Sequence, residues 1–180
     1  DINRLTYQDL RHSIRTVTQE PFLFSDTVEN NIAFAMEDRP EDWQEYFPSL
    51  LQQAALREEV DKFPLQEQTI VGEKGILLSG GQKQRISLAR AMATSCDLLI
   101  LDNVLSAVDY ETERYLLQQI FARRQAKSLL IVSHRVTAVE KADWILVLDE
   151  GRIVAQGTHE ELLQQPGYYQ EMWALQHETS

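Results

Sequence analysis

The sequence predicts an α/β fold in which the strands of a parallel sheet alternate with helices. Apolar runs rich in Leu, Ile and Val cover residues 14–18, 98–101, 129–132 and 144–148. Such runs are typical of parallel strands that are buried on both faces. Residues 82–92 and 116–121 instead carry apolar side chains at helical spacing. Because strand and helix alternate from Leu98 onward, we expect right-handed crossovers and a sheet that helices cover on both faces.

Residues 26–63 show a different pattern, with helical signals and no clear strand. Asp26 and Glu29 stand at the cap and N3 positions of one predicted helix, and Pro40 is expected to begin a second helical run. We interpret this stretch as a helical subdomain inserted into the α/β body.

The last part of the chain carries signals for a hairpin and a short helix. Residues 149–152 have the sequence Asp-Glu-Gly-Arg, which is typical of a tight turn between two strands. Thr158 followed by Glu161 fits a capping box, so we expect a C-terminal helix to begin there.

Composition limits the function classes. With 180 residues, of which 43% are hydrophobic and 25% charged, the chain has the size of one globular domain or a large piece of one. The net charge of -11 argues against nucleic acid as a partner, because it repels phosphate backbones. The single cysteine, Cys96, cannot form an internal disulfide and has no metal-ligand spacing around it. No apolar stretch approaches the roughly 20 residues that span a bilayer.

The sequence Leu-Ser-Gly-Gly-Gln at residues 78–82 precedes a convincing helix. Ser79 and Gln82 fit a capping box, which is the purely structural interpretation. Two glycines in a first helical turn cost about 1 kcal/mol each relative to alanine, so a cap alone does not explain Gly80 and Gly81. They allow an anion to approach the backbone N–H groups at the positive end of the helix, with the Ser79 hydroxyl as a further donor.

Three polar residues follow predicted strands. Asp102 ends the run 98–102, His134 follows the run 129–133, and Gln19 follows the first strand. Ligands of open α/β sheets bind beyond the carboxyl ends of the strands, where an acid is a common partner of phosphate-bound Mg²⁺. Taken singly, each residue also has a structural interpretation: a turn aspartate, a loop histidine, and an exposed amide before a proline-held turn.

In their order and positions these signals together resemble the ABC ATPase family. Gln19 stands where that family has its Q-loop, residues 78–82 read as its LSGGQ signature, and residues 98–102 read as its Walker B strand. Residues 106–109, Ser-Ala-Val-Asp, match the D-loop, and His134 matches the switch histidine. The resemblance covers essentially the whole chain.

Two further stretches are similar to ABC exporters. Residues 69–75 resemble the loop that precedes the exporter signature, and residues 20–24 with Asn30, Asn31 and Ile32 resemble the exporter Q-loop region. A plain connecting turn is the structural alternative for the first stretch. For the phenylalanines of the second, a buried anchor is the alternative to a surface that faces the coupling helices of a transmembrane domain.

The resemblance implies a parallel-sheet, P-loop NTPase-like (RecA-like) core that lacks its N-terminal part. Residues 1–25 would be the remnant of this core with the Q-loop, and residues 26–95 the helical subdomain with the signature. Residues 96–180 would return to the core with the Walker B strand, the D-loop, the switch histidine and a C-terminal hairpin with helices.

The resemblance also implies ATP and Mg²⁺ as cofactors and a second nucleotide-binding domain as partner. Residues 79–82 would contact ATP held by that second domain, and Asp109 would help to join the pair, although it also fits a plain N-cap. Asp102 and Gln19 would hold Mg²⁺ directly or through water. Other expected partners are the coupling helices of a transmembrane domain, which would place the chain at the cytoplasmic face of the cell membrane.

Two departures from the family limit the expected activity. The sequence contains no G-x-x-x-x-G-K-[ST], and residues 1–3 resemble the region after that loop, so we expect this chain alone to bind ATP poorly and not to hydrolyse it. Asn103 stands where active members have the glutamate that polarises the attacking water, and an amide is not a useful base. A degenerate site in a heterodimer, an engineered substitution, and a homodimer that only binds ATP each explain Asn103.

The leading hypothesis is part of the ATP-binding domain of an ABC exporter, which couples ATP binding and hydrolysis at a domain dimer to transmembrane export. His134 and the position of Asn103 would be its catalytic positions on this chain, the latter impaired. The alternative is a non-catalytic nucleotide-sensing or interaction module with a degenerate site. A soluble ABC ATPase of DNA repair or translation is disfavoured by the acidic charge.

Overall fold

The computed structural model describes residues 4–123 and 126–178. The chain divides into two compact units, one ending at Val132 and the other beginning at Ser133, and each is described by itself. Within the described residues, no helix has both the length and the apolar character that crossing a membrane requires.

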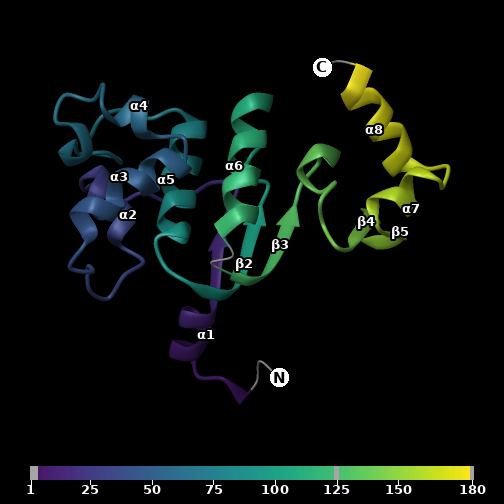
Figure 1. Ribbon diagram of the computed structural model, residues 1–180, viewed down its shortest axis with the longest axis horizontal. Helices are drawn as coiled ribbons and strands as arrows, with labels where there is room; N and C mark the ends of the chain where they lie inside the picture. The colour runs from purple at the N-terminus through teal and green to yellow at the C-terminus, as the bar shows by residue number, and fades with distance from the viewer. Residues whose placement is uncertain (1–3, 124–125, 179–180) are drawn as a thin grey trace. The chain divides into compact units, whose positions relative to one another are not determined.

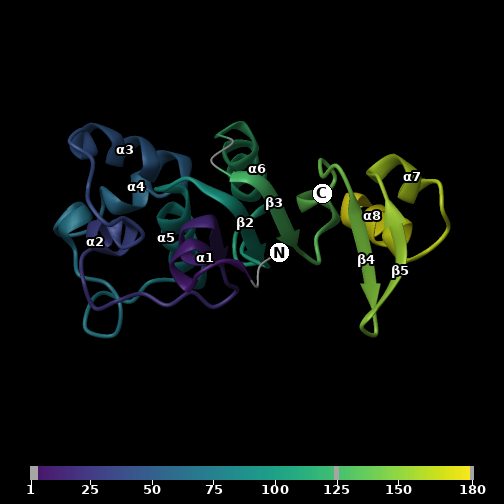
Figure 2. The same cartoon turned by 90° about the horizontal axis from the view of Figure 1, so that it is seen from below.

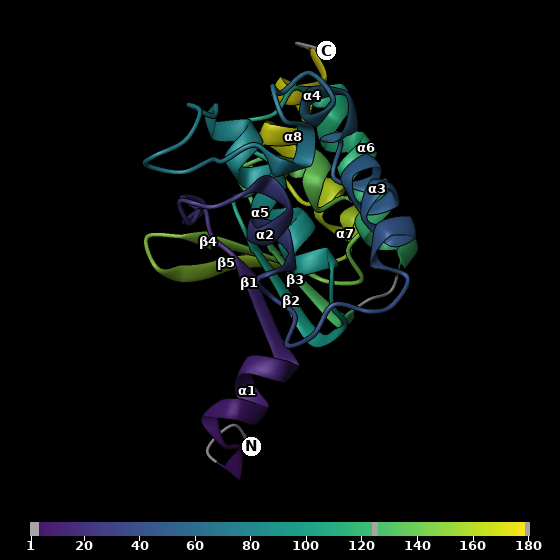
Figure 3. The same cartoon turned by 90° about the vertical axis from the view of Figure 1, so that its left-hand side faces the viewer.

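The first unit contains a three-stranded parallel sheet in the order β1-β2-β3 (Figure 1). Its strands are β1 (Ile14–Val17), β2 (Cys96–Asp102) and β3 (Ala126–Val132). Helix α6 (Tyr110–Arg123) connects β2 to β3, and the short helix α1 (Tyr7–Ser13) leads directly into β1 (Figure 3). The α/β prediction is therefore confirmed, and three of the four expected parallel strands are present.

The cover of this sheet differs between its two faces. Leu99 and Leu101 of β2 are buried, whereas Leu130 and Val132 of β3 are 49% and 50% exposed. Because side chains alternate along a strand, these two pairs lie on opposite faces. The expectation that helices cover both faces is wrong for the described part of this unit, because one face of β3 stays half open.

The remaining helices of the first unit gather around α5 (Figure 2). They are α2 (Val28–Ala33), α3 (Trp43–Gln53), α4 (Arg57–Val60), the 3₁₀ turn η2 (Gln66–Gln68) and α5 (Gly80–Met92). Helical structure is thus present where the sequence indicated it, while the boundaries 1–25, 26–95 and 96–180 stay predictions.

Two predicted helix starts in this segment are wrong by a few residues. The cap of α2 is Thr27, whose Oγ1 accepts a hydrogen bond from the Asn30 amide at 3.0 Å. Asp26 supports the cap from outside, because its Oδ1 accepts from the Thr27 amide at 2.7 Å. The second helix begins at Trp43, and Pro40 belongs to the preceding turn, where its carbonyl accepts from the Trp43 amide at 3.0 Å.

A buried carboxylate joins the helices of this segment. Glu29 on α2 is 5% exposed. It accepts hydrogen bonds from Trp43 Nε1 at 2.6 Å, Arg39 Nη1 at 3.1 Å and Gln68 Nε2 at 2.5 Å. Burying a charge is costly unless it is paired and hydrogen-bonded, and these three donors satisfy that condition. The carboxylate therefore links α2, α3 and η2.

The second unit is a hairpin with three short helical elements. Among its described residues, the hairpin strands are β4 (Ile145–Asp149) and β5 (Arg152–Gly157), and the helical elements are η3 (Val136–Ala138), α7 (His159–Leu163) and α8 (Tyr168–Glu178). The turn between the strands has positive φ at Glu150 (46°) and Gly151 (74°), as a tight hairpin turn requires. Thr158 and Glu161 form the expected capping box of α7.

One strand prediction fails in this unit. The run 144–148 is predicted to form a buried parallel strand, but β4 pairs antiparallel with β5 (Figure 2). Of this run, only Ile145 and Val147 are buried. These two side chains pack against Val136, Leu162 and Tyr169 in the core of the unit. A run of apolar residues does not distinguish the two kinds of strand, because Leu146 and Leu148 are apolar although exposed.

Removing the buried carboxylate is expected to destabilise the first unit. Glu29→Ala leaves Trp43 Nε1 and Gln68 Nε2 without their acceptor and should lower the free energy of unfolding by about 3 kcal/mol. The matched control is Asp61→Ala, which removes an exposed i,i+4 ion pair with Arg57 and should cost about 0.3–0.5 kcal/mol. Urea unfolding measures both, and equal shifts would contradict the structural role of Glu29.

Candidate functional site

The start of α5 leaves two backbone amides available. Ser79 Oγ accepts a hydrogen bond from the Gln82 amide at 3.2 Å, and Gln82 Oε1 accepts one from the Ser79 amide at 2.8 Å. The predicted capping box is therefore present. The amides of Gly80 and Gly81 donate to no described residue, and Gly80 is exposed whereas Gly81 is buried. Since α5 is 13 residues long, these N–H groups lie at the positive end of a substantial helix and suit an anion.

Gly81 has a second role that sequence reasoning missed. A Cβ added at Gly81 would lie 2.8 Å from the Ala107 carbonyl oxygen and 3.6 Å from Val108 Cγ1. At Gly80 the nearest atom would be Ala107 Cβ at 3.9 Å, which is an ordinary contact. The bare backbone at Gly81 therefore lets the helix start pack closely on residues 106–109. No sequence signal connects these two positions, because 26 residues separate Gly81 from Ala107.

Asp102 and Asn103 lie at the carboxyl end of β2, as the sequence predicted. Asp102 is the last residue of the strand and its side chain is exposed. Asn103 has a φ of 50°, its amide donates to the Val132 carbonyl at 2.8 Å, and its own carbonyl accepts from Ser106 Oγ at 2.9 Å. Asparagine tolerates this left-handed conformation better than most residues, so Asn103 also suits the backbone of this turn.

Gln19 lies near the same end of the sheet. Strands β1 and β2 are parallel, with Val17 opposite Leu101, so Gln19 and Asp102 both follow this paired position within two residues. The side chain of Gln19 is exposed, and its backbone carbonyl accepts a hydrogen bond from Gln84 Nε2 on α5 at 3.1 Å. The sheet therefore brings together Gln19, Asp102 and Asn103.

These residues do not form a complete metal cage. Among the described residues, no group of three or more His, Cys, Asp or Glu side chains is placed to hold a metal ion. Mg²⁺ in nucleotide sites usually has only one or two protein ligands and takes the rest from phosphate and water. The exposed Asp102 carboxylate fits that requirement.

Asp109 caps α6. Its Oδ1 accepts from the Thr112 amide at 2.9 Å and its Oδ2 from Thr112 Oγ1 at 2.7 Å. The backbone hydrogen bond from Thr112, followed by the side-chain bond, lowers the pKa of this exposed carboxyl below its ordinary value. The N-cap interpretation of Asp109 is confirmed by this geometry, and its role in joining two domains stays a prediction.

His134 belongs to the second unit, where its side chain is exposed. The backbone beside it is held by Gln176 of α8, whose Nε2 donates to the His134 carbonyl at 3.2 Å and whose Oε1 accepts from the Val136 amide at 2.9 Å. Sequence reasoning missed Gln176, because the two positions are 42 residues apart.

Three phenylalanines form an exposed aromatic patch after Gln19. Phe22 and Phe24 are 65% and 37% exposed, so the alternative of a buried anchor is wrong for both, and Phe34 is 61% exposed. The ring centroid of Phe24 lies 5.1 Å from that of Phe22 and 4.4 Å from that of Phe34. Clustered, exposed aromatic rings are typical of a protein–protein contact surface.

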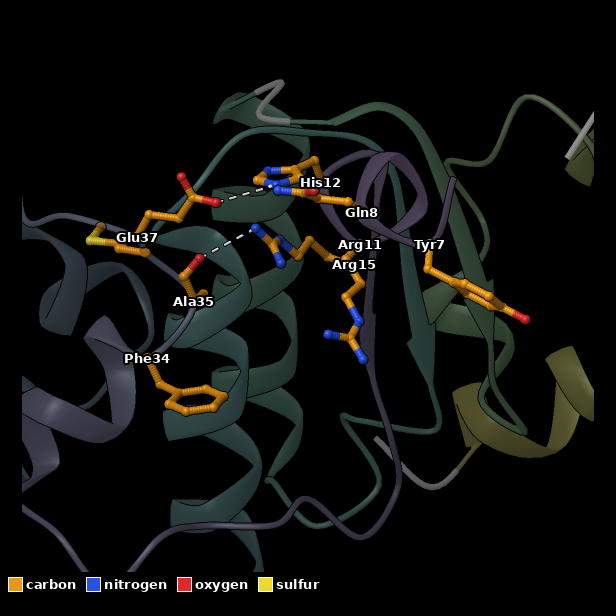
Figure 4. Close-up of a pocket in the computed structure, with 9 residues that line it drawn as sticks. Tyr7, Gln8, Arg11, His12, Arg15, Phe34, Ala35 and Glu37 are labelled. Carbon is orange, nitrogen blue, oxygen red and sulfur yellow. Dashed lines mark hydrogen bonds and ion pairs between the residues drawn. The ribbon is translucent and has the colours of Figure 1, made fainter. Parts of the chain in front are cut away.

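A pocket of about 680 Å³ opens beside this patch, between α1 with β1 and the segment after α2 (Figure 4). Arg11, His12 and Arg15 line one side of the pocket, and Phe34 and Glu37 line the other (Figure 4). His12 Nε2 lies 3.4 Å from Glu37 Oε1, and Arg15 donates to a backbone carbonyl. None of the predicted site residues lines this pocket.

Comparisons with known proteins identify the family of the chain. A family model described as ABC transporter matches residues 1–106. The chain is 38% identical over 176 residues to the ATP-dependent lipid A-core flippase of Haemophilus ducreyi, covering 98% of the chain and 30% of that protein. It is 39% identical over 175 residues to the multidrug resistance-like ATP-binding protein MdlA of Escherichia coli, covering 97% of the chain and 29% of that protein.

A solved structure shows the same fold. The structure of a bacterial Atm1-family ABC exporter with ATP bound matches with a TM-score of 0.88 and 35% identity, over 98% of this chain and 31% of that one. The fold is thus that of part of the nucleotide-binding domain of an ABC exporter. The chain belongs to the ABC transporter family and spans about 30% of the length of the relatives it matches.

The contact between Gly81 and Ala107 gives a prediction about stability. Gly81→Ala places a Cβ against the Ala107 carbonyl and should destabilise the first unit by about 1–3 kcal/mol. Gly80→Ala, the matched control, meets no close atom and should be neutral or stabilise by up to about 1 kcal/mol. Thermal unfolding without nucleotide measures both. If the two variants melt alike, the close packing at Gly81 is not a constraint.

Proposed function

We propose that this chain is part of the ATP-binding domain of an ABC exporter and that its signature helix completes a nucleotide site on a second domain. The start of α5 carries this proposal, because its free glycine amides and its exposed Ser79 point to an anionic ligand. Gly81 packs on residues 106–109, so the same contact also fixes the orientation of these groups.

The nucleotide would supply the phosphates, and Mg²⁺ would offset their negative charge. On this chain, the Asp102 carboxylate would hold the metal at the end of β2, and the Gln19 amide would approach the same region from β1. Asn103 would line the site without acting as a base, because an amide has no carboxylate charge to orient and activate water. His134 would contact the terminal phosphate region.

A second nucleotide-binding domain is the proposed partner, and a heterodimer explains Asn103 most simply. In that assembly the site lined by Asn103 would mostly bind ATP, while residues 79–82 would serve the competent site of the partner. The proposed contact with transmembrane coupling helices is the aromatic patch, since its rings are exposed beside Gln19. This contact would place the chain at the cytoplasmic face of a membrane.

Because the printed sequence contains no G-x-x-x-x-G-K-[ST], the chain by itself lacks the backbone nest and lysine that hold β- and γ-phosphates. We therefore expect this chain alone to bind ATP weakly and not to hydrolyse it. The names lipid A-core flippase and multidrug resistance-like protein belong to relatives of this chain. The transported substrate would be a property of the complete protein.

A non-catalytic nucleotide-sensing module is the second candidate. Asn103 favours it, because the usual base is replaced and the local backbone accommodates asparagine at positive φ. The two candidates differ in whether the partner's turnover needs the signature of this chain.

Ser79→Arg tests the leading proposal. In the complete transporter with Mg²⁺ and ATP, an arginine at this position would block approach of the opposing nucleotide, so steady-state ATP hydrolysis should fall by on the order of 100-fold or more. Thr158→Arg is the control, because it removes a similar capping box at α7, a cost of about 1 kcal/mol, and Thr158 is not one of the predicted site residues. Unchanged hydrolysis in the Ser79 variant would favour the sensing module.

Asn103→Glu tests the degenerate site. Restoring a carboxylate should raise turnover at the site lined by this residue by about 10²–10⁴-fold, measured as single-turnover ATP hydrolysis in the complete transporter. The positive φ of residue 103 should make this variant less stable by about 1 kcal/mol. Asn103→Gln is the matched control with similar size and no charge, and it should give no gain. A site that stays equally slow with glutamate is limited by something other than Asn103.

A further inference from the structure

Arg90, near the end of α5, binds the segment that follows Gln19. Its Nε donates to the Asn31 carbonyl at 2.7 Å, its Nη2 to Asn31 Oδ1 at 3.0 Å, and its Nη1 to the Phe22 carbonyl at 3.1 Å. All three guanidinium nitrogens are therefore used. Hydrogen bonds from a charged donor are about twice as strong as neutral ones, so this is a firm attachment.

The same guanidinium supports the aromatic patch. Its carbon lies 5.9 Å from the Phe24 ring centroid and 5.7 Å from that of Phe34, within the range of cation–π attraction. Asn31 extends the network, because its Oδ1 also accepts from the Phe24 amide at 2.9 Å and its Nδ2 donates to the Phe24 carbonyl at 3.0 Å. Arg90 and Asn31 thus fix both the backbone and the rings of the patch.

A second attachment lies six residues earlier on the same helix. Gln84 is 3% exposed, and its Nε2 donates to the Gln19 carbonyl at 3.1 Å. The other end of this amide, Oε1, is buried and has no partner among the described residues. A half-satisfied buried amide costs free energy that an apolar side chain would avoid, so stability alone does not explain Gln84.

The two attachments connect distant parts of the site through one rigid element. Helix α5 begins at the signature with Gly80 and spans 13 residues, about 20 Å. Gln84 and Arg90 fasten it to Gln19 and to the aromatic patch, which precede it by some 60 residues in the sequence. Rigid secondary elements are one of the means by which energetic coupling is carried between distant sites.

We propose that Arg90 and Gln84 are positioning residues that make the signature start of α5 and the aromatic patch move together. Binding of nucleotide at Ser79 would then restrict the motion of Phe22 and Phe24. Binding of a partner to the aromatic patch would in turn shift the position of Ser79. This inference rests on the proposed function, which supplies the nucleotide at one end and the partner at the other.

Amide hydrogen exchange of the complete transporter, with and without Mg²⁺ and ATP, tests the connection. In the unmodified protein, ATP should slow exchange at Gly80 and Gly81 and also at the Phe24 amide, which donates to Asn31. Arg90→Lys keeps the charge but cannot reach three acceptors at once. It should keep the ATP effect at Gly80 and Gly81 and reduce the effect at Phe24 by about tenfold, the factor that one hydrogen bond represents.

Arg85→Lys is the matched control. Arg85 lies on the same helix with a side chain 12% exposed, and its Nη2 pairs with Glu59 Oε1 on α4 at 2.6 Å rather than with the segment after Gln19. It should lose stability as Arg90→Lys does, yet keep the ATP effect at Phe24. Gln84→Met is the second variant, for the case in which Arg90→Lys does not fold. It should remain stable and should weaken the ATP effect at the amides of residues 19 and 20.

The outcomes separate the two levels of the proposal. If ATP slows exchange at Gly80 and Gly81 while Phe24 responds equally in the Arg90→Lys, Arg85→Lys and unmodified proteins, Arg90 is only structural and the inference is overturned. If ATP changes nothing at Gly80 and Gly81 in the unmodified protein, the proposed function fails instead.

Discussion

The close approach of a bare helix start to a loop carbonyl is the constraint on which the candidate site depends. Gly81 leaves no room for a Cβ beside the Ala107 carbonyl, so the first turn of α5 and residues 106–109 are held as one surface. The Ser79 cap satisfies the Gln82 amide, whereas the amides of Gly80 and Gly81 donate to no described residue. Close packing explains the glycine at position 81, and the proposed anion contact would explain the glycine at position 80.

The parallel sheet explains why the remaining polar residues gather. Strands β1 and β2 run in the same direction, so Gln19 and Asp102 emerge at one end although more than 80 residues separate them. The turn at Asn103 has a positive φ and is held by Val132 and Ser106. This environment gives asparagine a conformational advantage at the position where the proposed function would place a catalytic carboxylate, so backbone and proposed chemistry favour different residues there.

Local patterns made most elements predictable. Apolar runs indicated β1, β2 and β3, and the Ser79–Gln82 and Thr158–Glu161 pairs marked two helix starts, because capping needs only residues three apart. The sequence predicted a fully buried strand at β4, because the exposed residues Leu146 and Leu148 are apolar like the buried ones. Thr27 rather than Asp26 caps α2, since both residue types fit a cap and only the folded backbone decides between them.

The contacts that connect these elements could not be predicted from a single sequence. Arg90 binds carbonyls of Phe22 and Asn31, and Gln84 binds that of Gln19, across some 60 residues of chain. Every residue has a backbone carbonyl whatever its side chain, so the residue types at positions 19–31 do not indicate these contacts. The signature could be recognised from its residues, whereas the hydrogen bonds that join its helix to the aromatic patch could be seen only in the structure.

A structure of the complete transporter, assembled as a pair of nucleotide-binding domains with Mg²⁺ and ATP, measures the central claim directly. The account predicts that Ser79 Oγ and the amides of Gly80 and Gly81 lie within about 3 Å of phosphate oxygens of a nucleotide held by the opposing domain. A structure in which the start of α5 faces solvent or its own domain, with no nucleotide near it, would contradict the account.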